Sequence, residues 1–511
     1  MRMKFADLFE ISTPPTPVEA KTAANLLAEL SGHDVYPQSV TRQDGVCYAL
    51  GRQGTDKHLL ILFRGDAAPA GFQGEGQGVT RDGVDATLLV CPMDLSNGAA
   101  LRATLPYTKP RRLGLATSAG CGDRLGLATP GHIQALRGKG IAAILAQQSM
   151  RENARTGRTP EEVVNDAAWG VFQEGWREGY GADADHLKTP EHIDLCVAAG
   201  YTFFTIDPGD HVNNEAHSAP LEQVLHLVED LPWQELESSP ADMRRRYLGQ
   251  TFALSEDLTI GFTEETLARA AGKYGRAIAH TVRMYRHLAS RCDDFELEMS
   301  VDETETVTSP EEHFFIAAEL KRLGVKWVSL APRYVGRFEK GVDYIGDPDA
   351  LAASLARHAA IARHMGPYKL SIHSGSDKFS VYPIFAEVTQ GLVHLKTAGT
   401  SYLEALRAIA RVRPELFRRC LEVAIAHYPR ERASYHVSAE LARVRDPRVI
   451  ADPDLPGCLD QFDTRQVLHV GYGVVLDAFG TEIKQILQEH EEEHYAALRA
   501  HFEKHLRPFV R

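Results

Sequence analysis

The sequence predicts an α/β fold, in which a TIM-like (β/α)8 barrel with helical insertions follows a small β-rich N-terminal domain. Three observations lead to this prediction. The chain has 511 residues, which is more than one minimal core needs. Beyond about residue 112, short apolar segments alternate with helix-length stretches, as in βα units with a parallel sheet. Eight such apolar segments can be counted, and a closed barrel of this type has eight strands.

Residues 1–108 are predicted to form the small α+β N-terminal domain. Turns rich in glycine and polar residues separate three short apolar runs, which span residues 45–52, 57–65 and 85–94. Residues 105–112 contain two prolines and three basic residues, which disfavour a regular element and indicate a linker. Residues 109–511 are then expected to form the barrel.

The barrel strands are expected within eight segments, namely residues 112–120, 141–149, 201–211, 295–304, 325–333, 368–377, 392–401 and 434–440. Helical patterns fill most of the gaps between them. In one such helix, Ser309 is the predicted N-cap, Glu312 completes a capping box and Gly324 ends the helix. A doubly wound open sheet is the alternative fold. No G-x-G-x-x-G follows a strand, so a dinucleotide loop is not predicted.

Helical insertions are expected at residues 149–192 and 213–290, and a helical tail after residue 440. The second insertion contains a long amphipathic helix, for which packing against the barrel or against another subunit is the simpler interpretation. The charged last helix is interpreted in the same way, as facing solvent or a subunit. A homo-oligomer is therefore left open.

Composition excludes several classes of protein. The net charge of −13 argues against a general surface for nucleic acid or acidic membrane. No apolar stretch has the length of a membrane span, and the N-terminus has no apolar secretion signal. Seven cysteines without CxxC spacing indicate reduced thiols in a cytoplasmic protein. The expected partner is a small molecule.

Polar side chains follow the predicted strands, at the end of a barrel where catalytic residues normally lie. A single histidine at such a position is more often a structural residue, and a single aspartate is more often a helix cap. The joint pattern across the strands points to one site. Its candidate members are Asp123, Gln147, Arg151, Asp207, Glu303, His373, Ser374, Lys378, Lys396, Thr397 and His436.

Within this set, His373, His436 and Glu303 have the character of a metal site with two imidazoles and one carboxylate. Such a donor set suits a divalent cation, and Zn, Mn, Ni and Co all remain open. The period-two pattern of the fourth predicted strand allows Glu298 or Asp302 as the carboxylate instead of Glu303. In the sixth predicted strand, His373 shares the inward face with Lys369 and Ser371.

Three further residues have competing interpretations. Lys396 would point into the barrel, where a lysine needs an anionic partner or a lowered pKa. His469 is expected to be structural, unless the C-terminal tail folds over the mouth of the barrel. Thr397 opens a turn that caps a helix or cradles a small anion.

Several long motifs together resemble the tagaturonate epimerase family. The motifs are GCGDRLGLATPGHI, SVDETETVTSPEEHFFIAAEL, APRYVGRFEKGVDYIGD, YKLSIHSGSDKFSVYP, HLKTAGTSYLEALR and RASYHVSA. The similarity extends from about residue 112 to beyond residue 470, and the N-terminal domain is less distinctive. Members of the family are also described as fructuronate/tagaturonate epimerases, and some act as tagatose or fructose 4-epimerases.

The resemblance implies a metal-dependent epimerase that interconverts D-tagaturonate and D-fructuronate, with the metal on Glu303, His373 and His436. The epimerised carbon is β to the ketone, so simple enolisation does not acidify its C–H. A retro-aldol/aldol route is therefore expected, with Asp123 as acid/base and Glu303 as the fallback. Arg151, Lys396 or Lys378 would hold the substrate carboxylate. Gln147, Asp207, Ser374 and Thr397 complete the expected substrate contacts.

Two rival functions remain at this stage. A metal-dependent sugar isomerase or a class II-type aldolase would use the same barrel and the same kind of site, and would be recognised by its products. A non-catalytic sugar-binding protein on a decayed barrel is the other rival. The polar residues at the strand ends argue against decay.

Overall fold

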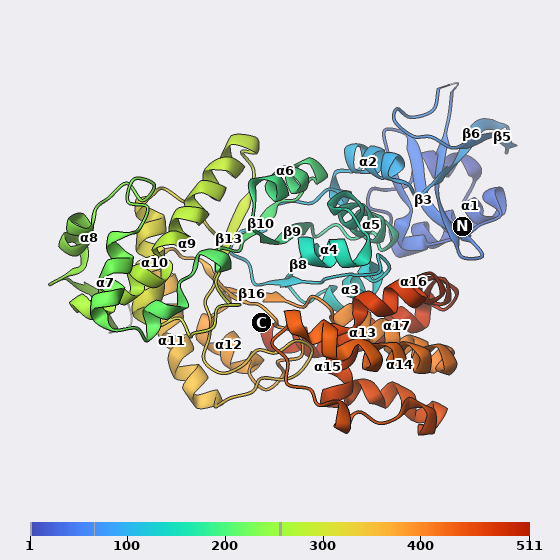
Figure 1. Cartoon of the computed structure of the whole chain (residues 1–511). Helices are drawn as coiled ribbons and strands as arrows, with labels where there is room; N and C mark the ends of the chain where they lie inside the picture. Colours follow the sequence, from blue (N-terminus) through green and yellow to red (C-terminus); the bar gives the residue numbers. More distant parts are fainter. Residues whose placement is uncertain (1–2, 66, 255–257, 511) are drawn as a thin grey trace.

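The computed structural model describes residues 3–65, 67–254 and 258–510, and it contains a strand-rich N-terminal part, a barrel and a group of C-terminal helices (Figure 1). The N-terminal sheet is antiparallel with the order β1-β3-β4-β6-β5, and β2 pairs with β3. Its elements are α1 (Pro17–Ser31), β1 (Asp34–Val35), β2 (Thr41–Gln43), β3 (Val46–Gln53), β4 (Asp56–Phe63), β5 (Glu75–Arg81), β6 (Val84–Pro92) and α2 (Leu95–Thr104).

The predicted barrel is confirmed. Eight parallel strands close on themselves, and the last strand, β16, pairs with the first, β7. The strands are β7 (Ser118–Gly120), β8 (Ala142–Ser149), β9 (Tyr180–Leu187), β10 (Phe203–Ile206), β13 (Glu296–Ser300), β14 (Ser329–Ala331), β15 (Lys369–Ile372) and β16 (Val393–Lys396).

At least one helix follows each barrel strand along the chain, which gives the βα repeat. These helices are α3 (Thr129–Leu136), α4 (Met150–Thr156), α5 (Pro160–Gln173), α6 (Pro190–Ala199), α9 (Glu264–Arg291), α10 (Pro310–Arg322), α11 (Pro348–Met365), α12 (Tyr382–Thr389) and α13 (Thr400–Val412). The local signals are those expected from the sequence: Ser309 caps α10 in a capping box, and Asp347 caps α11.

Two groups of elements extend the barrel. Between β10 and α9 lie α7 (Leu221–Glu229), α8 (Pro240–Tyr247) and the small antiparallel pair β11 (Thr251–Ala253) and β12 (Thr259–Gly261). After α13 come α14 (Pro414–Glu431), α15 (Phe462–Val470), α16 (Tyr472–Glu489) and α17 (Glu491–Leu506), which gather on one side of the barrel (Figure 1). These C-terminal helices share a second hydrophobic core with α13, and α17 packs on α3 and α13.

Two details of the predicted barrel were wrong. The segment 149–192 is not a helical insertion, because it contains the third barrel strand, β9. The segment 434–440 is not the eighth strand, because it has no strand residues and forms a loop that continues from α14. The segment of β9 was not recognised as a strand, because it alternates alanines with aspartates instead of forming the apolar run typical of a parallel strand.

Among the described residues, no helix is both long and apolar enough to cross a membrane. All seven cysteines are unpaired.

Candidate active site

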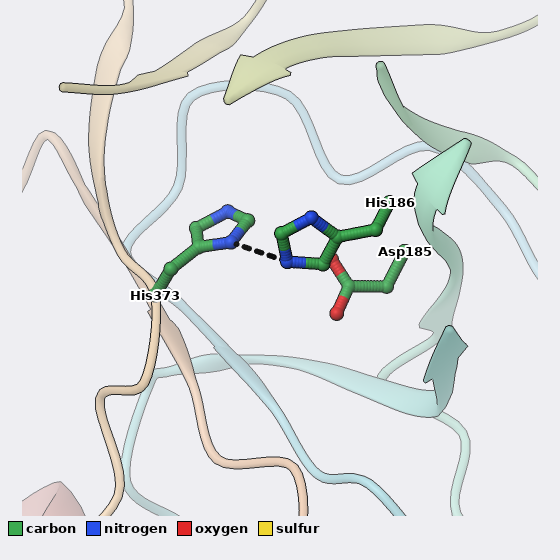
Figure 2. Close-up of side chains that lie close together, drawn as sticks. All are labelled: Asp185, His186 and His373. Atoms are coloured by element: carbon green, nitrogen blue, oxygen red, sulfur yellow. Dashed lines mark hydrogen bonds and ion pairs between the residues drawn. The ribbon is translucent and has the colours of Figure 1, made fainter. Parts of the chain in front are cut away.

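Polar side chains converge where the barrel strands end, and β9 contributes two adjacent ones. Side chains at neighbouring strand positions normally point to opposite faces. Here β9 advances from residue 184 to 187 while β10 advances from 204 to 206, so β9 contains one extra residue, and His186 has φ +53°. A bulge of this kind re-aims side chains. It lets Asp185 and His186 both lie near His373, which follows β15 (Figure 2).

Two imidazoles face each other at the centre of the site, and each has a carboxylate behind it. His186 Nε2 lies 3.2 Å from His373 Nδ1, as the dashed line in Figure 2 shows. On its far side, His186 Nδ1 lies 3.0 Å from Asp207, and His373 Nε2 lies 2.6 Å from Glu298. With the outer nitrogens donating to the carboxylates, the pair holds a proton between the inner nitrogens, and loss of that proton would leave two lone pairs for a cation.

Lys396, the last residue of β16, is surrounded by acids. Its ammonium lies 2.9 Å from Asp183, 2.8 Å from Asp185 and 3.0 Å from Glu298, and it donates to Thr205 at 2.7 Å. The lysine is almost fully buried, so these contacts occur at low dielectric. Lys396 therefore fixes three carboxylates below the imidazole pair.

Carboxylates outnumber cationic side chains around the imidazole pair, and these charges shift the pKa values of His186, Asp185 and Glu298. Burial disfavours a charged His186, yet Asp185 and Asp207 more than compensate and raise the pKa of His186 to about 10. Burial would raise the pKa of Asp185 and Glu298, but Lys396 outweighs it and lowers both. The site is therefore built to hold positive charge between the two imidazoles.

A cleft of about 240 Å3 opens above the imidazole pair, and several predicted residues line it. Glu303, His373, Ser374 and His436 all face this space, together with Asp302, Tyr334, Lys340 and Tyr435. Glu303 lies at the rim, 3.5 Å from Arg151 and 3.7 Å from Lys340. These cations, with His186, lower the pKa of Glu303 although burial opposes the shift.

The three predicted metal ligands thus line one cleft, but they do not form one cluster. At this cleft the closely spaced donor atoms belong to Asp185, His186 and His373, or to His186, Asp207 and Glu303; a third group, Asp377, His501 and His505, lies elsewhere. His436 is exposed and belongs to neither group. His186 takes the central position that the sequence had suggested for His436.

The geometry gives several other candidates a structural role. Asp123 caps the turn after β7, because its carboxylate accepts the backbone N–H groups of Leu125, Gly126 and Ala128. Thr397 is buried and donates to the carbonyl of Gly120 at 2.7 Å. These contacts occupy the groups that were expected to serve catalysis or substrate binding.

Lys378 also makes all of its hydrogen bonds within the protein. It is fully buried, and its ammonium donates to the carbonyls of Glu339, Val342 and Ser376 at 2.8, 2.5 and 2.9 Å. An ammonium has three protons, so none is left for a substrate carboxylate. Lys378 instead ties the loop that carries Lys340 to the loop after His373. Lys396 is similarly occupied by the acids around it.

The remaining predicted residues keep a place at the site. Gln147 is buried in the barrel, and its amide approaches Asp185 at 3.4 Å. Asp207 supports His186 from behind, and Arg151 lies at the rim.

Sequence reasoning missed Asp183, Asp185, His186 and Lys340. The signal for the first three was the stretch YGADADHL, in which Asp183 and Asp185 alternate with alanines and His186 directly follows.

Comparisons with known proteins identify relatives over nearly the whole chain. The model of a family described as tagaturonate epimerase matches residues 36–509. A tagaturonate/fructuronate epimerase from Thermotoga maritima is 43% identical over 481 residues, which cover 93% of this chain and 96% of that protein. Crystal structures of a fructuronate-tagaturonate epimerase from Cohnella laeviribosi, native and with glycerol, superpose with a TM-score of 0.87 at 38% identity. The superposed region covers 96% of this chain and 99% of the chain in each crystal structure.

Proposed function

The chain belongs to the tagaturonate epimerase family, and from that membership we propose that it interconverts D-tagaturonate and D-fructuronate. It is an epimerase, because the relatives that match nearly the whole chain are named as epimerases of fructuronate and tagaturonate. The unpaired cysteines favour a reducing compartment, and we place the enzyme in the cytoplasm.

A divalent metal between His186 and His373 is the second part of the proposal. The observation that carries it is the pair of inner nitrogens, 3.2 Å apart, on two rings whose outer nitrogens face carboxylates, so that a cation could replace the proton between the rings. Two imidazole ligands of one tetrahedral ion lie about 3.3 Å apart, given metal–nitrogen distances of about 2.0–2.1 Å. Asp185 or Glu303 would supply a third ligand. His436 remains a candidate from the same cleft.

The metal would polarise the ketone and stabilise the negative charge that develops on its oxygen. The two sugars differ at C4, which is β to the C2 ketone. A base takes the proton of the C4 hydroxyl, the C3–C4 bond breaks, and its electron pair moves toward the ketone. The products are an aldehyde fragment that begins at C4 and the enediolate of C1–C3. The aldehyde presents its other face, the bond forms again, and the proton returns to the C4 oxygen.

The residues of the chain divide this work. Whichever of Asp185 and Glu303 does not bind the metal serves as the base, because both carboxylates border the space beside His186 and the surrounding cations keep them ionised. Lys396 keeps Asp185 in place through a 2.8 Å contact. Transient oxidation at C4 is less favoured, because the sequence has no dinucleotide loop.

The test is to strip the purified protein with a chelator and to add D-tagaturonate with Zn²⁺, Mn²⁺, Ni²⁺ or Co²⁺, one metal at a time. We expect no turnover after stripping and formation of D-fructuronate with at least one metal. Full activity after exhaustive stripping would remove the metal from the proposal. Absence of D-fructuronate with every metal would remove the substrate assignment.

A further inference from the structure

A small recess adjoins the cleft beside His186, where the barrel meets the C-terminal helices. Its volume is about 30 Å3, which is room for roughly two water molecules or one carboxylate group. The recess and the cleft share Lys340 and Tyr435 in their linings. A ligand in the cleft can therefore extend one end into the recess.

Arg124, Arg151 and Lys340 line the recess, together with His186 and the carboxylates of Glu152 and Asp185. Asp185 pairs with Lys396 at 2.8 Å, and Arg151 and Lys340 are the two cations with the longest carboxylate contacts. Arg124 is neutralised, because it donates to Glu152 at 3.0 and 2.8 Å. Arg151 and Lys340 lie 3.5 and 3.7 Å from Glu303, which is longer than a close charged hydrogen bond of about 2.7–2.9 Å. A carboxylate in the recess would give both cations a closer partner.

The recess also contains a histidine with unmet hydrogen-bonding capacity. His469, from α15, is 1% exposed, and neither ring nitrogen has a partner in the described part of the chain. Burial, Arg124 and Lys340 hold the pKa of His469 well below its usual range, so the ring is neutral, with one N–H donor and one acceptor.

Two glycines leave room for the ring of His469. A Cβ on Gly399 would lie 2.4 Å from its Cε1, and a Cβ on Gly341 would lie 3.1 Å from its Nδ1. Leaving such a buried donor unsatisfied is costly, so the arrangement points to a ligand group that completes it.

We propose that this recess receives the carboxylate of the ketohexuronate, with Arg151 and Lys340 supplying positive charge and His469 donating a hydrogen bond. The inference rests on the proposed function and deepens it. In a ketohexuronate the carboxylate is at C6, so after C3–C4 cleavage it belongs to the aldehyde fragment. Holding that carboxylate keeps the fragment in the site while C4 turns its other face, and it selects the uronate over the neutral ketose.

The experiment compares kcat/KM for D-tagaturonate and for D-tagatose, which lacks the carboxylate, in the metal-loaded enzyme. The variants are Lys340→Met, Arg151→Met, His469→Gln and His469→Phe. We expect each Met variant and His469→Phe to lose roughly 10- to 100-fold on the uronate, as for a lost hydrogen bond to a charged group, and much less on tagatose. His469→Gln, which keeps a donor, should restore most of the preference.

Equal losses on both sugars would overturn the proposal, because they would indicate a structural role. Arg337→Met gives a second check, since this exposed arginine of the Lys340 loop lines the cleft but not the recess, and faces Glu339 at 3.4 Å. If Arg337→Met lowers the preference as much as Lys340→Met, a general positive field explains the selectivity and the recess does not.

Failure of the proposed function can be distinguished from failure of this inference. If the wild-type enzyme turns over neither sugar, calorimetric binding of D-glycerate, a three-carbon carboxylate, is compared with binding of glycerol. Tighter binding of glycerate that Lys340→Met and His469→Phe abolish would support the recess without the reaction. Equal binding of the two compounds would contradict it.

Discussion

The orientation of two imidazole rings decides what the site can bind, and carboxylates behind the rings set that orientation. Asp207 holds His186 and Glu298 holds His373, so the nitrogens that face each other share a proton that a cation could replace. The sequence predicted His373 because alternation from Lys369 placed it on the inward face. It could not predict the tautomers, which depend on Asp207, directly after β10, and on Glu298 of β13, which only folding brings close.

Asp207→Asn tests the support behind His186. Asparagine keeps the shape but loses the charge that fixes the ring, so we expect metal affinity to fall by roughly 10- to 100-fold. The dissociation constant is measured by competition with a chelating dye. Asp210→Asn is the matched control, since Asp210 is a nearby exposed acid that pairs with Lys188 at 3.0 Å. Equal affinity in both variants would contradict the role of Asp207.

At the scale of elements, β9 shows what the sequence could and could not predict. The other seven strands were found in segments with more large apolar residues, such as Phe203, Phe204 and Ile206 of β10 or Leu297 and Met299 of β13. In β9 Asp183 and Asp185 take inward positions, and their burial is tolerated because Lys396 of β16 lies 2.9 and 2.8 Å away. That compensation comes from a strand more than 200 residues later in the chain. Local pattern alone therefore could not predict β9.

Gly399 tests how the start of α13 supports the site. Gly399 and Gly324 both have positive φ, +89° and +75°, so alanine at either should cost about 1 kcal/mol of strain. Only at position 399 would the new Cβ meet the ring of His469; at Gly324 there is nothing within 4 Å. We expect Gly399→Ala to lose at least about tenfold in kcat/KM and Gly324→Ala to keep its activity. Equal kcat/KM values in the two variants, with both proteins folded, would sink this explanation.

At the scale of the whole molecule, the C-terminal helices complete a site that the barrel begins. The helix α15 carries His469 into the recess, and α17 packs against α3 and α13. The sequence predicted a structural role for His469 unless the C-terminal tail folded over the mouth of the barrel. In the structure the tail does fold there, because α15 places His469 in the recess. Amphipathic patterns predicted the helices themselves, but not the face of the barrel on which they pack.

Acid should destabilise the whole molecule through buried neutral histidines. Burial lowers the pKa of His132, His358 and His494 to about 4 and that of His505 to about 3. These values lie below the ordinary pKa of about 6.5, so the unfolded state binds more protons as pH falls from about 6.5 to 4. The free energy of unfolding therefore decreases over this window, by up to about 1.4 kcal/mol per pH unit for each histidine.

Urea unfolding at several pH values measures this slope. The backbone N–H of Asp377 donates to His505 Nε2 at 2.9 Å, and His505→Gln keeps an acceptor for it. The variant should reduce the change of unfolding free energy with pH by up to about 1.4 kcal/mol per pH unit. His427→Gln is the control, because His427 is exposed. An unchanged slope in His505→Gln would refute the assignment.

Epimerisation of D-tagaturonate carrying deuterium at C4 tests the central claim most directly, with product followed by NMR and rate compared with the unlabelled sugar. If the C3–C4 bond breaks and the C4–H bond does not, D-fructuronate keeps all of its deuterium and forms at the same rate as from unlabelled sugar. Loss of the label to water, or a marked slowing by deuterium, would contradict the retro-aldol route.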